Sequence, residues 1–403
     1  MLIKSNILRN NNELILIYSY FSIFMMALFF SPLISYIIGM LSLLFLSPFM
    51  KIGLVRISTV SIVFLQLLVI FGSRGYYDEL DSDLDIYYHV YYLVSNNLRS
   101  GLYFFGGGIE IGWPLLYWVV GKFIIMEPIQ LAILNSVISF FLIFFWLEKF
   151  VIPEVNINER GVIYFFILLF INTIMFGFLQ RQALTLGFLL FALTSKNNKN
   201  LIFFVLLASL FHISSIPIGI VIYLSRKVTF NRKRVLLLLS VLIVIRLAIV
   251  PILLLILSIF SFDFISHKLT GFTINGFSIS TLRYLTLYIC LLPFLFNERE
   301  FDNKNDKYLY NYAVFATLSI IAFVGINLFS DRIFMLALVI YGVFYYRYIY
   351  INNKIVGILL ALLYFFPFLL EKNNIIGSLA LGDSFWSRYD YWGEDIFYYL
   401  KRL

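Results

Sequence analysis

Cysteine and histidine are nearly absent from this chain of 403 residues, which has one cysteine and three histidines. A lone Cys290 cannot form an intramolecular disulfide. No group of cysteine and histidine residues has the spacing of a metal site either. We therefore expect no disulfide, no metal site and no bound cofactor.

Charged side chains are also scarce, at 13% of the residues, whereas hydrophobic residues make up 62%. A soluble domain is nearer one half apolar, so this chain has too little polar surface for one. Apolar runs of roughly 17–25 residues recur along most of the chain, which is the length that a helix needs to cross a membrane. The sequence predicts an all-α polytopic membrane protein, with one integral domain over residues 1–403 and about 11–13 transmembrane helices.

The basic residues are grouped in short clusters between the apolar runs, near residues 51–56, 196–199 and 226–234. This pattern explains the net charge of +8 by membrane topology, so we expect no nucleic-acid partner. With these clusters in the cytoplasm, residues 73–127 form an outer loop that carries interfacial helices. The same count puts two further segments outside, a loop at 261–281 and an aromatic, polar tail at 371–403.

Residues 111–126 leave an alternative open, because they are apolar but short and carry Pro114 and Lys122. If they do not cross the membrane, Arg181 lies on the outer side and both later basic clusters lie inside. If they do cross, Arg181 moves to the cytoplasmic side. We favour the first topology because it satisfies the positive-inside rule at both clusters.

The apolar run 201–224 has basic residues at both ends, so a single crossing would break that rule. It is interrupted by polar or helix-breaking residues, namely His212, Ser214, Ser215 and Pro217. Discontinuous helices are tolerated at membrane depth where they line a cavity. We therefore predict a broken or re-entrant helix pair that meets near His212.

Five ionisable residues fall at the outer ends of spans or in the outer loop under this topology: Asp83, Glu110, Arg181, His212 and Arg332. Each has an ordinary structural reading, as a snorkelling anchor, a helix-packing group or part of a solvated loop. An ionisable group in a span costs at least about 2.5–3.5 kcal/mol, which makes it a functional candidate. Together they offer cations that bind a diphosphate and groups that move a proton.

Short motifs surround these residues in a fixed order: Asp83-Leu-Asp-Ile-Tyr87, Glu110-Ile-Gly112, Arg181-Gln182, Phe211-His-Ile-Ser214 and Arg332-Ile-Phe. In this order the sequence resembles the EpsG-like branch of the Wzy-type polysaccharide polymerases. The resemblance covers residues 73–350, and each motif is weak by itself.

One element departs from the family pattern. The aspartate element commonly follows Gly-x-Asp in the family, whereas Ser82 precedes Asp83 here. Asp81, Asp83 and Asp85 therefore all stay candidates for the aspartate's role.

The resemblance implies a C-type glycosyltransferase-like fold and metal-independent glycosyl transfer. The expected enzyme joins undecaprenyl-diphosphate-linked repeat units into O-antigen, capsule or exopolysaccharide. It is expected to be a multi-pass protein of the bacterial inner membrane, with its active site facing the periplasm. Its partners would be the lipid-linked donor and acceptor, with a chain-length regulator in the membrane as a further candidate.

This hypothesis gives each candidate a role. Arg181 and Arg332 would grip the diphosphate, because a guanidinium binds phosphate oxygens with a planar fork. Asp83, Glu110 and His212 are the catalytic candidates, and the sequence does not choose the base among them. Three aromatic residues would stack on sugar rings: Tyr87, Trp113 and Trp118.

Two other classes of protein also fit the sequence. A flippase of lipid-linked oligosaccharide would use cations and aromatics, but along a path through the bilayer, whereas these charges gather on one side. A membrane acyltransferase that modifies surface polysaccharide would also use a membrane histidine.

Overall fold

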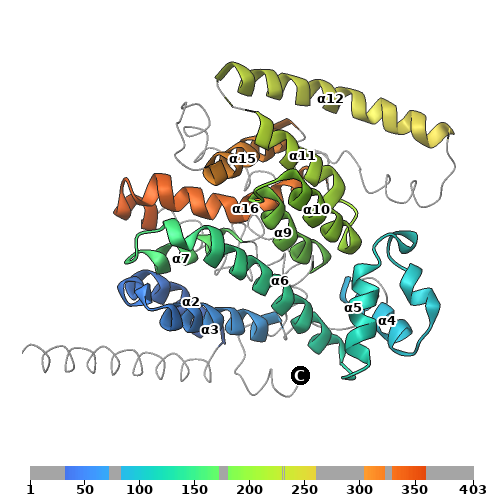
Figure 1. Cartoon of the computed structure of the whole chain (residues 1–403), viewed down its shortest axis with the longest axis horizontal. Helices are drawn as coiled ribbons and strands as arrows, with labels where there is room; N and C mark the ends of the chain where they lie inside the picture. The colour runs from blue at the N-terminus through green and yellow to red at the C-terminus, as the bar shows by residue number, and fades with distance from the viewer. Residues whose placement is uncertain are drawn as a thin grey trace, which may run out of the picture.

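The computed structural model describes residues 32–71, 83–171, 180–228, 230, 232–259, 304–322 and 329–359. Every regular element in these ranges is a helix (Figure 1). The predicted loop at 261–281 and the predicted tail at 371–403 lie outside the described residues.

The α-helices are α2 (Pro32–Phe45), α3 (Gly53–Phe71), α4 (Asp83–Ser95), α5 (Gly112–Gly121), α6 (Pro128–Phe150), α7 (Arg160–Phe170), α9 (Gln180–Leu193), α10 (Asn198–Phe211), α11 (Ser215–Lys227), α12 (Arg232–Ile259), α15 (Lys304–Ala322) and α16 (Phe329–Tyr345). Short 3-10 turns are η1 (Ser47–Lys51), η2 (Arg99–Tyr103), η3 (Gly106–Gly108) and η4 (Ile152–Glu154), and η5 (Tyr346–Tyr350) is a π-helical turn.

The long helices form one bundle around a continuous hydrophobic core (Figure 1). α9 packs against both α6 and α10, while α7 packs against α2 and α16. α4 and α5 pack on each other at one end of the bundle, around a small and largely aromatic core that Leu131 of α6 and Leu184 of α9 complete. We call this unit, residues 83–127, the outer region.

Glycines allow the closest helix contacts in the bundle. A Cβ at Gly342 of α16 would lie 2.6 Å from the Cα of Ile167 in α7. A Cβ at Gly187 of α9 would lie 2.5 Å from the Cβ of Leu142 in α6. Small residues at such crossings let helix backbones approach, which is how helices associate where lipid removes the hydrophobic driving force.

One helix in the described part of the chain, Pro128–Glu154, is long and apolar enough to cross a membrane by length and composition. Its first turn is fixed by a capping box, in which Glu127 and Gln130 bond each other's backbone amides. Shorter apolar helices also occur, at Ile34–Phe45, Gly53–Val69, Arg160–Phe170, Asn198–Phe211 and Met335–Tyr350.

Two contacts fix the relative direction of α6 and α9. Asn135 Nδ2 donates to Gln180 Oε1 near the start of both helices, over 2.9 Å. Trp146 Nε1 donates to Thr194 Oγ1 near their ends, over 3.1 Å. The two helices therefore run parallel, which both of the alternative sequence topologies expect.

α5 bears on the question that residues 111–126 left open. It has ten residues, which at 1.5 Å per residue gives about 15 Å, half of a hydrocarbon core of about 30 Å. Its Tyr117 hydroxyl accepts a hydrogen bond from Asn135, in the second turn of α6. α5 is thus a short helix beside the start of α6, and whether this segment crosses a membrane stays a prediction.

Candidate functional site

A glycine turn precedes the carboxylate at the centre of the site. Gly106, Gly107 and Gly108 have φ of 58°, 67° and 94°, a region that side chains with a Cβ rarely adopt. The turn closes where the Glu110 amide donates to the Phe105 carbonyl over 3.4 Å. Glu110 then enters the protein interior with only 1% of its surface exposed.

A break between two helices supplies the histidine. α10 ends at His212, whose φ of −156° and ψ of 120° are extended rather than helical. α11 begins at Ser215 and has Pro217 in its first turn, where proline needs no amide hydrogen. The break points the buried His212 imidazole at Glu110. Whether the pair is re-entrant in a membrane stays a prediction.

Glu110 accepts hydrogen bonds from three donors, one at the start of α9 and two in the turn between α10 and α11. Arg181 Nη1, at the start of α9, lies 2.7 Å from Oε2. His212 Nδ1 lies 2.8 Å from Oε1, and the Ile213 amide nitrogen lies 3.0 Å from the same oxygen. One carboxylate thus joins α5, α9 and the α10–α11 turn.

These donors keep Glu110 ionised. Burial by itself would raise its pKa, but the hydrogen bond and charge of His212, the charge of Arg181 and the Ile213 amide lower the pKa to about 2. An ionised carboxylate only accepts hydrogen bonds, so we assign the shared hydrogen to His212 Nδ1. His212 Nε2 then faces Gln182 Nε2 at 3.5 Å.

Arg181 lies on an aromatic platform. Its guanidinium carbon is 4.5 Å from the centre of the Phe105 ring and 5.8 Å from that of Tyr87. About a quarter of its side chain is exposed, against 1% for Glu110. The guanidinium is therefore oriented by Glu110 and the two rings while one part of it can meet an anion.

Asp83 begins α4 and lies close enough to affect Tyr87 and Arg181 by its charge. Asp85 is 2% exposed, and Asp81 lies outside the described residues. The charge of Asp83 acts on Arg181, so we keep Asp83 as the prediction for the aspartate role.

Arg332 falls in the first turn of α16, but its side chain lies outside the described part of the structure. Its predicted role at the diphosphate stays a prediction. The other four ionisable candidates, Asp83, Glu110, Arg181 and His212, come together at one end of the bundle.

The aromatic candidates differ in exposure. Tyr87 and Trp113 are 2% and 0% exposed and pack in the small core of the outer region. Their ring faces are covered in this structure, because Trp113 packs against Tyr87 and against the edge of Phe211. Trp118 is 41% exposed and lines a groove on the outer region instead.

Three contacts at the site were not predicted from the sequence. Phe105 supports the Arg181 guanidinium, Gln182 faces His212 Nε2, and the Ile213 amide donates to Glu110. Gln182 follows Arg181 within a motif, so the sequence could have indicated its place at the site. The sequence cannot indicate which backbone amide, such as that of Ile213, will bind a carboxylate.

The comparisons with known proteins give one match. A family model described as the EpsG family matches residues 57–389, a range that contains every motif of the site from Asp83 to Arg332. Neither the curated proteins nor the solved structures gave a match.

Proposed function

Because this chain belongs to the EpsG family, we propose that it is a glycosyltransferase that polymerises lipid-linked oligosaccharides. The family places it in polysaccharide biosynthesis at a membrane, and the apolar helix Pro128–Glu154 agrees with that location. The proposed substrates are repeat units on undecaprenyl diphosphate, and the product is O-antigen, capsule or exopolysaccharide.

The observation that carries the proposal is the cluster of Glu110, Arg181 and His212. A buried carboxylate holds a guanidinium on one oxygen and an imidazole on the other, at 2.7 and 2.8 Å. An anion-binding group and a proton-accepting group are thus fixed side by side. Transfer of a sugar from a diphosphate to a hydroxyl needs both.

In the proposed reaction, a hydroxyl oxygen at the nonreducing end of a new unit attacks the anomeric carbon of the growing glycan. The bond from that carbon to the diphosphate oxygen breaks, and undecaprenyl diphosphate leaves with the electron pair. The hydroxyl proton passes to His212 Nε2. We favour His212 over Glu110 as base, because Glu110 accepts three hydrogen bonds of 2.7–3.0 Å, whereas His212 Nε2 faces Gln182 Nε2 at a longer 3.5 Å and the incoming hydroxyl would displace that contact.

Glu110 then has a positioning role. It holds the hydrogen on Nδ1, so that Nε2 is the proton acceptor, and its charge balances the imidazolium that forms. Arg181 stabilises the leaving diphosphate, which is already ionised and needs charge rather than a proton. Arg332 is the second proposed diphosphate ligand.

The proposed membrane placement puts this cluster at the periplasmic face. The opposite end of the bundle has the basic clusters, including Arg56 bound to Glu148 and Arg226 bound to Ser195. α11 runs from the His212 turn to Arg226, which joins the two ends. The positive-inside rule supports the cytoplasm for the Arg226 end.

Replacing Arg181 by Lys tests the proposal, because an ammonium cannot reproduce the planar fork. Cells with this variant should make no polymer while the protein still inserts into the membrane. Arg226→Lys is the matched control, since it changes an arginine of the other end, and its polysaccharide ladder should be normal. A normal ladder from Arg181→Lys would overturn the assignment.

Deletion of the protein separates the candidate functions. Single repeat units on the lipid core identify a lost polymerase. Absent surface sugar would instead identify a flippase, and full-length chains without acyl groups an acyltransferase, so either result would overturn the proposal.

A further inference from the structure

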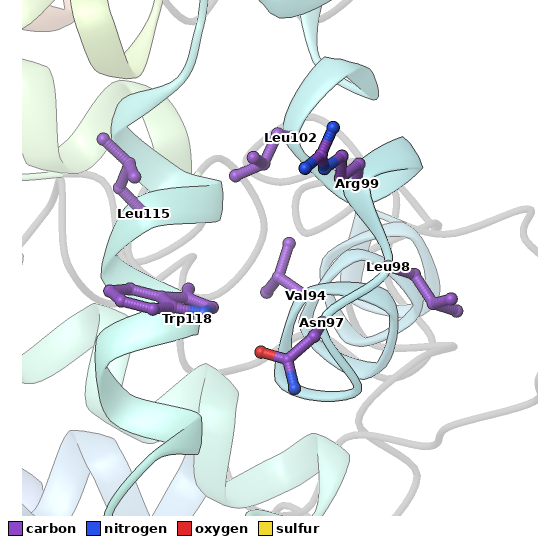
Figure 2. A pocket seen from close by; sticks show the side chains of 7 residues that line it. All are labelled: Val94, Asn97, Leu98, Arg99, Leu102, Leu115 and Trp118. Atoms are coloured by element: carbon purple, nitrogen blue, oxygen red, sulfur yellow. The ribbon is translucent and has the colours of Figure 1, made fainter.

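The outer region has a groove that the proposed chemistry does not use. It lies between α5 and the segment from the end of α4 into η2, with a volume of about 280 Å³. Figure 2 shows Leu115 and Trp118 of α5 on one side, with Val94 and Leu102 opposite them. Asn97, Leu98 and Arg99 complete the lining.

The lining suits a hydrocarbon chain rather than a sugar. Five of the seven lining side chains are apolar, and a sugar would need hydrogen-bond partners along its length. Of the two polar side chains, Asn97 already accepts a hydrogen bond from Lys122 Nζ through its Oδ1, over 2.8 Å. The volume of about 280 Å³ is just below the range of whole-ligand pockets, about 300–1,000 Å³, so the groove would hold only part of a long chain.

Two cations lie at this groove. Arg99 lines it and is exposed, and Lys122 reaches it through Asn97 and lies 5.5 Å from the centre of the Trp118 ring. Among the described residues, no carboxylate forms an ion pair with either cation. An apolar groove with two cations is complementary to an anionic head group that carries an apolar chain.

Exposed apolar side chains continue from the groove. Phe123, Ile124 and Ile125 are 82%, 56% and 91% exposed, directly after Lys122. This segment is held beside α4, because the Tyr91 hydroxyl donates to the Ile124 carbonyl and accepts from the Met126 amide, both over 2.9 Å. A fixed strip of exposed apolar residues beside cations is the pattern of a surface that lies in a lipid interface.

We propose that this groove binds an anionic phospholipid of the surrounding membrane. The phosphate is held by Arg99 and Lys122, and an acyl chain lies between Trp118 and Leu115 on one side and Val94 on the other. The lipid would tie α4 and α5 together at the membrane surface. Since α5 directly follows Glu110, the bound lipid would also steady the outer region on which the site is built.

The test is a lipid titration of the full-length purified protein in detergent, followed by native mass spectrometry. Phosphatidylglycerol is the anionic probe, and phosphatidylethanolamine is the zwitterionic one. Wild-type protein should bind phosphatidylglycerol more tightly. Changing both Arg99 and Lys122 to Gln should weaken that binding about 5- to 30-fold, from about 1 kcal/mol per basic residue near an anionic surface.

Two further variants distinguish the contribution of the apolar groove to lipid binding from that of positive charge. Leu115→Trp fills the groove from an exposed position of α5 and should weaken phosphatidylglycerol binding while both cations stay. Lys149→Gln is the control, because it removes a cation that lies over Phe145 and Phe150, at the far end of α6. Its lipid binding should match the wild type.

Several outcomes would overturn the proposal. They are equal binding of the two lipids by the wild type, no effect of the double Gln variant, and no effect of Leu115→Trp. Competition by inorganic phosphate at millimolar concentration would show a simple anion site and would also overturn it. The melting temperature of each variant is measured as well. A value equal to that of the wild type shows that weaker lipid binding is not caused by unfolding.

Discussion

Glu110→Gln perturbs the centre of the site with little change of volume. The carboxylate accepts from Arg181 on one oxygen and from His212 and the Ile213 amide on the other. An amide has one acceptor oxygen and one donor nitrogen. Whichever way it turns, the NH2 group of the glutamine faces a donor, so at least one buried hydrogen bond is lost.

The lowered pKa of Glu110 sets the size of the effect on stability. A pKa of about 2 in the folded protein against 4.5 for a carboxyl in water corresponds to about 3 kcal/mol of stabilisation. Because the folded pKa is the lower one, this stabilisation is complete above pH 4.5. It is lost as the pH falls from 4.5 towards 2.

The effect on catalysis follows from the positioning role. Without a carboxylate, the hydrogen on His212 Nδ1 is no longer held there. The variant should then lose the rate enhancement of about 10²- to 10⁴-fold that a general base contributes. That range corresponds to about 2.7–5.4 kcal/mol in the barrier. Polymer formation by the folded fraction should fall by this factor.

Thermal unfolding of purified protein in detergent and polymerisation in vitro measure the two effects. The stability gap between wild type and Glu110→Gln should shrink as the pH falls below 4.5. Glu148→Gln is the matched control, because Glu148 is also a carboxylate paired with an arginine, 2.6 Å from Arg56 Nη2. It should lower stability but leave the rate per folded molecule unchanged.

Two results would refute the reasoning. A stability gap that does not narrow below pH 4.5 would show that the charge of Glu110 is not the cause. If Glu110→Gln polymerises at the wild-type rate per folded molecule, Glu110 does not contribute to catalysis.

Three more predictions follow. His212→Gln removes the Nε2 proton acceptor and should slow polymerisation in vitro about 10²- to 10⁴-fold, with donor binding preserved, since the proposed diphosphate ligands are Arg181 and Arg332. Gly342→Ala puts a methyl group 2.6 Å from the Cα of Ile167, a backbone atom that cannot turn away, and should cost about 1–3 kcal/mol in thermal unfolding. Tyr91→Phe removes the hydroxyl that accepts from the Met126 amide, so hydrogen exchange at that amide should rise about five- to tenfold or more.

The gathering of the site at one end could be predicted from the sequence for a physical reason. In a chain this apolar, each charge has to lie at a membrane surface or in a polar cavity, so counting spans assigns it to a side. That count put Glu110, Arg181 and His212 together, and the structure joins them within 2.8 Å.

Which atoms meet could not be predicted in the same way. Membrane topology assigns a residue to a side, but it does not fix the rotation of its helix or the side chains that surround it. Tyr87 and Trp113 were expected to face sugars because aromatic rings suit that role, yet tertiary packing buries both. The central place of Glu110 depends on a backbone amide, at Ile213, which looks like any other amide in the sequence.

A comparison of two carboxylate–arginine pairs, Arg181 with Glu110 and Arg56 with Glu148, supports a ligand role for Arg181 and a structural role for Arg56. Arg56 donates Nε and Nη2 to Glu148 and Nη1 to the Met50 carbonyl, and its side chain is 7% exposed. All three of its nitrogens thus have protein acceptors. Arg181 donates Nη1 to Glu110, interacts with Tyr87 as well and keeps a quarter of its side chain exposed. In the Arg56 pair the more exposed partner is the carboxylate, with 21% of the Glu148 side chain exposed, whereas in the Arg181 pair it is the guanidinium. Glu110 is enclosed and Arg181 is not, which is the asymmetry expected where the buried partner orients a cation for an anion that arrives from outside.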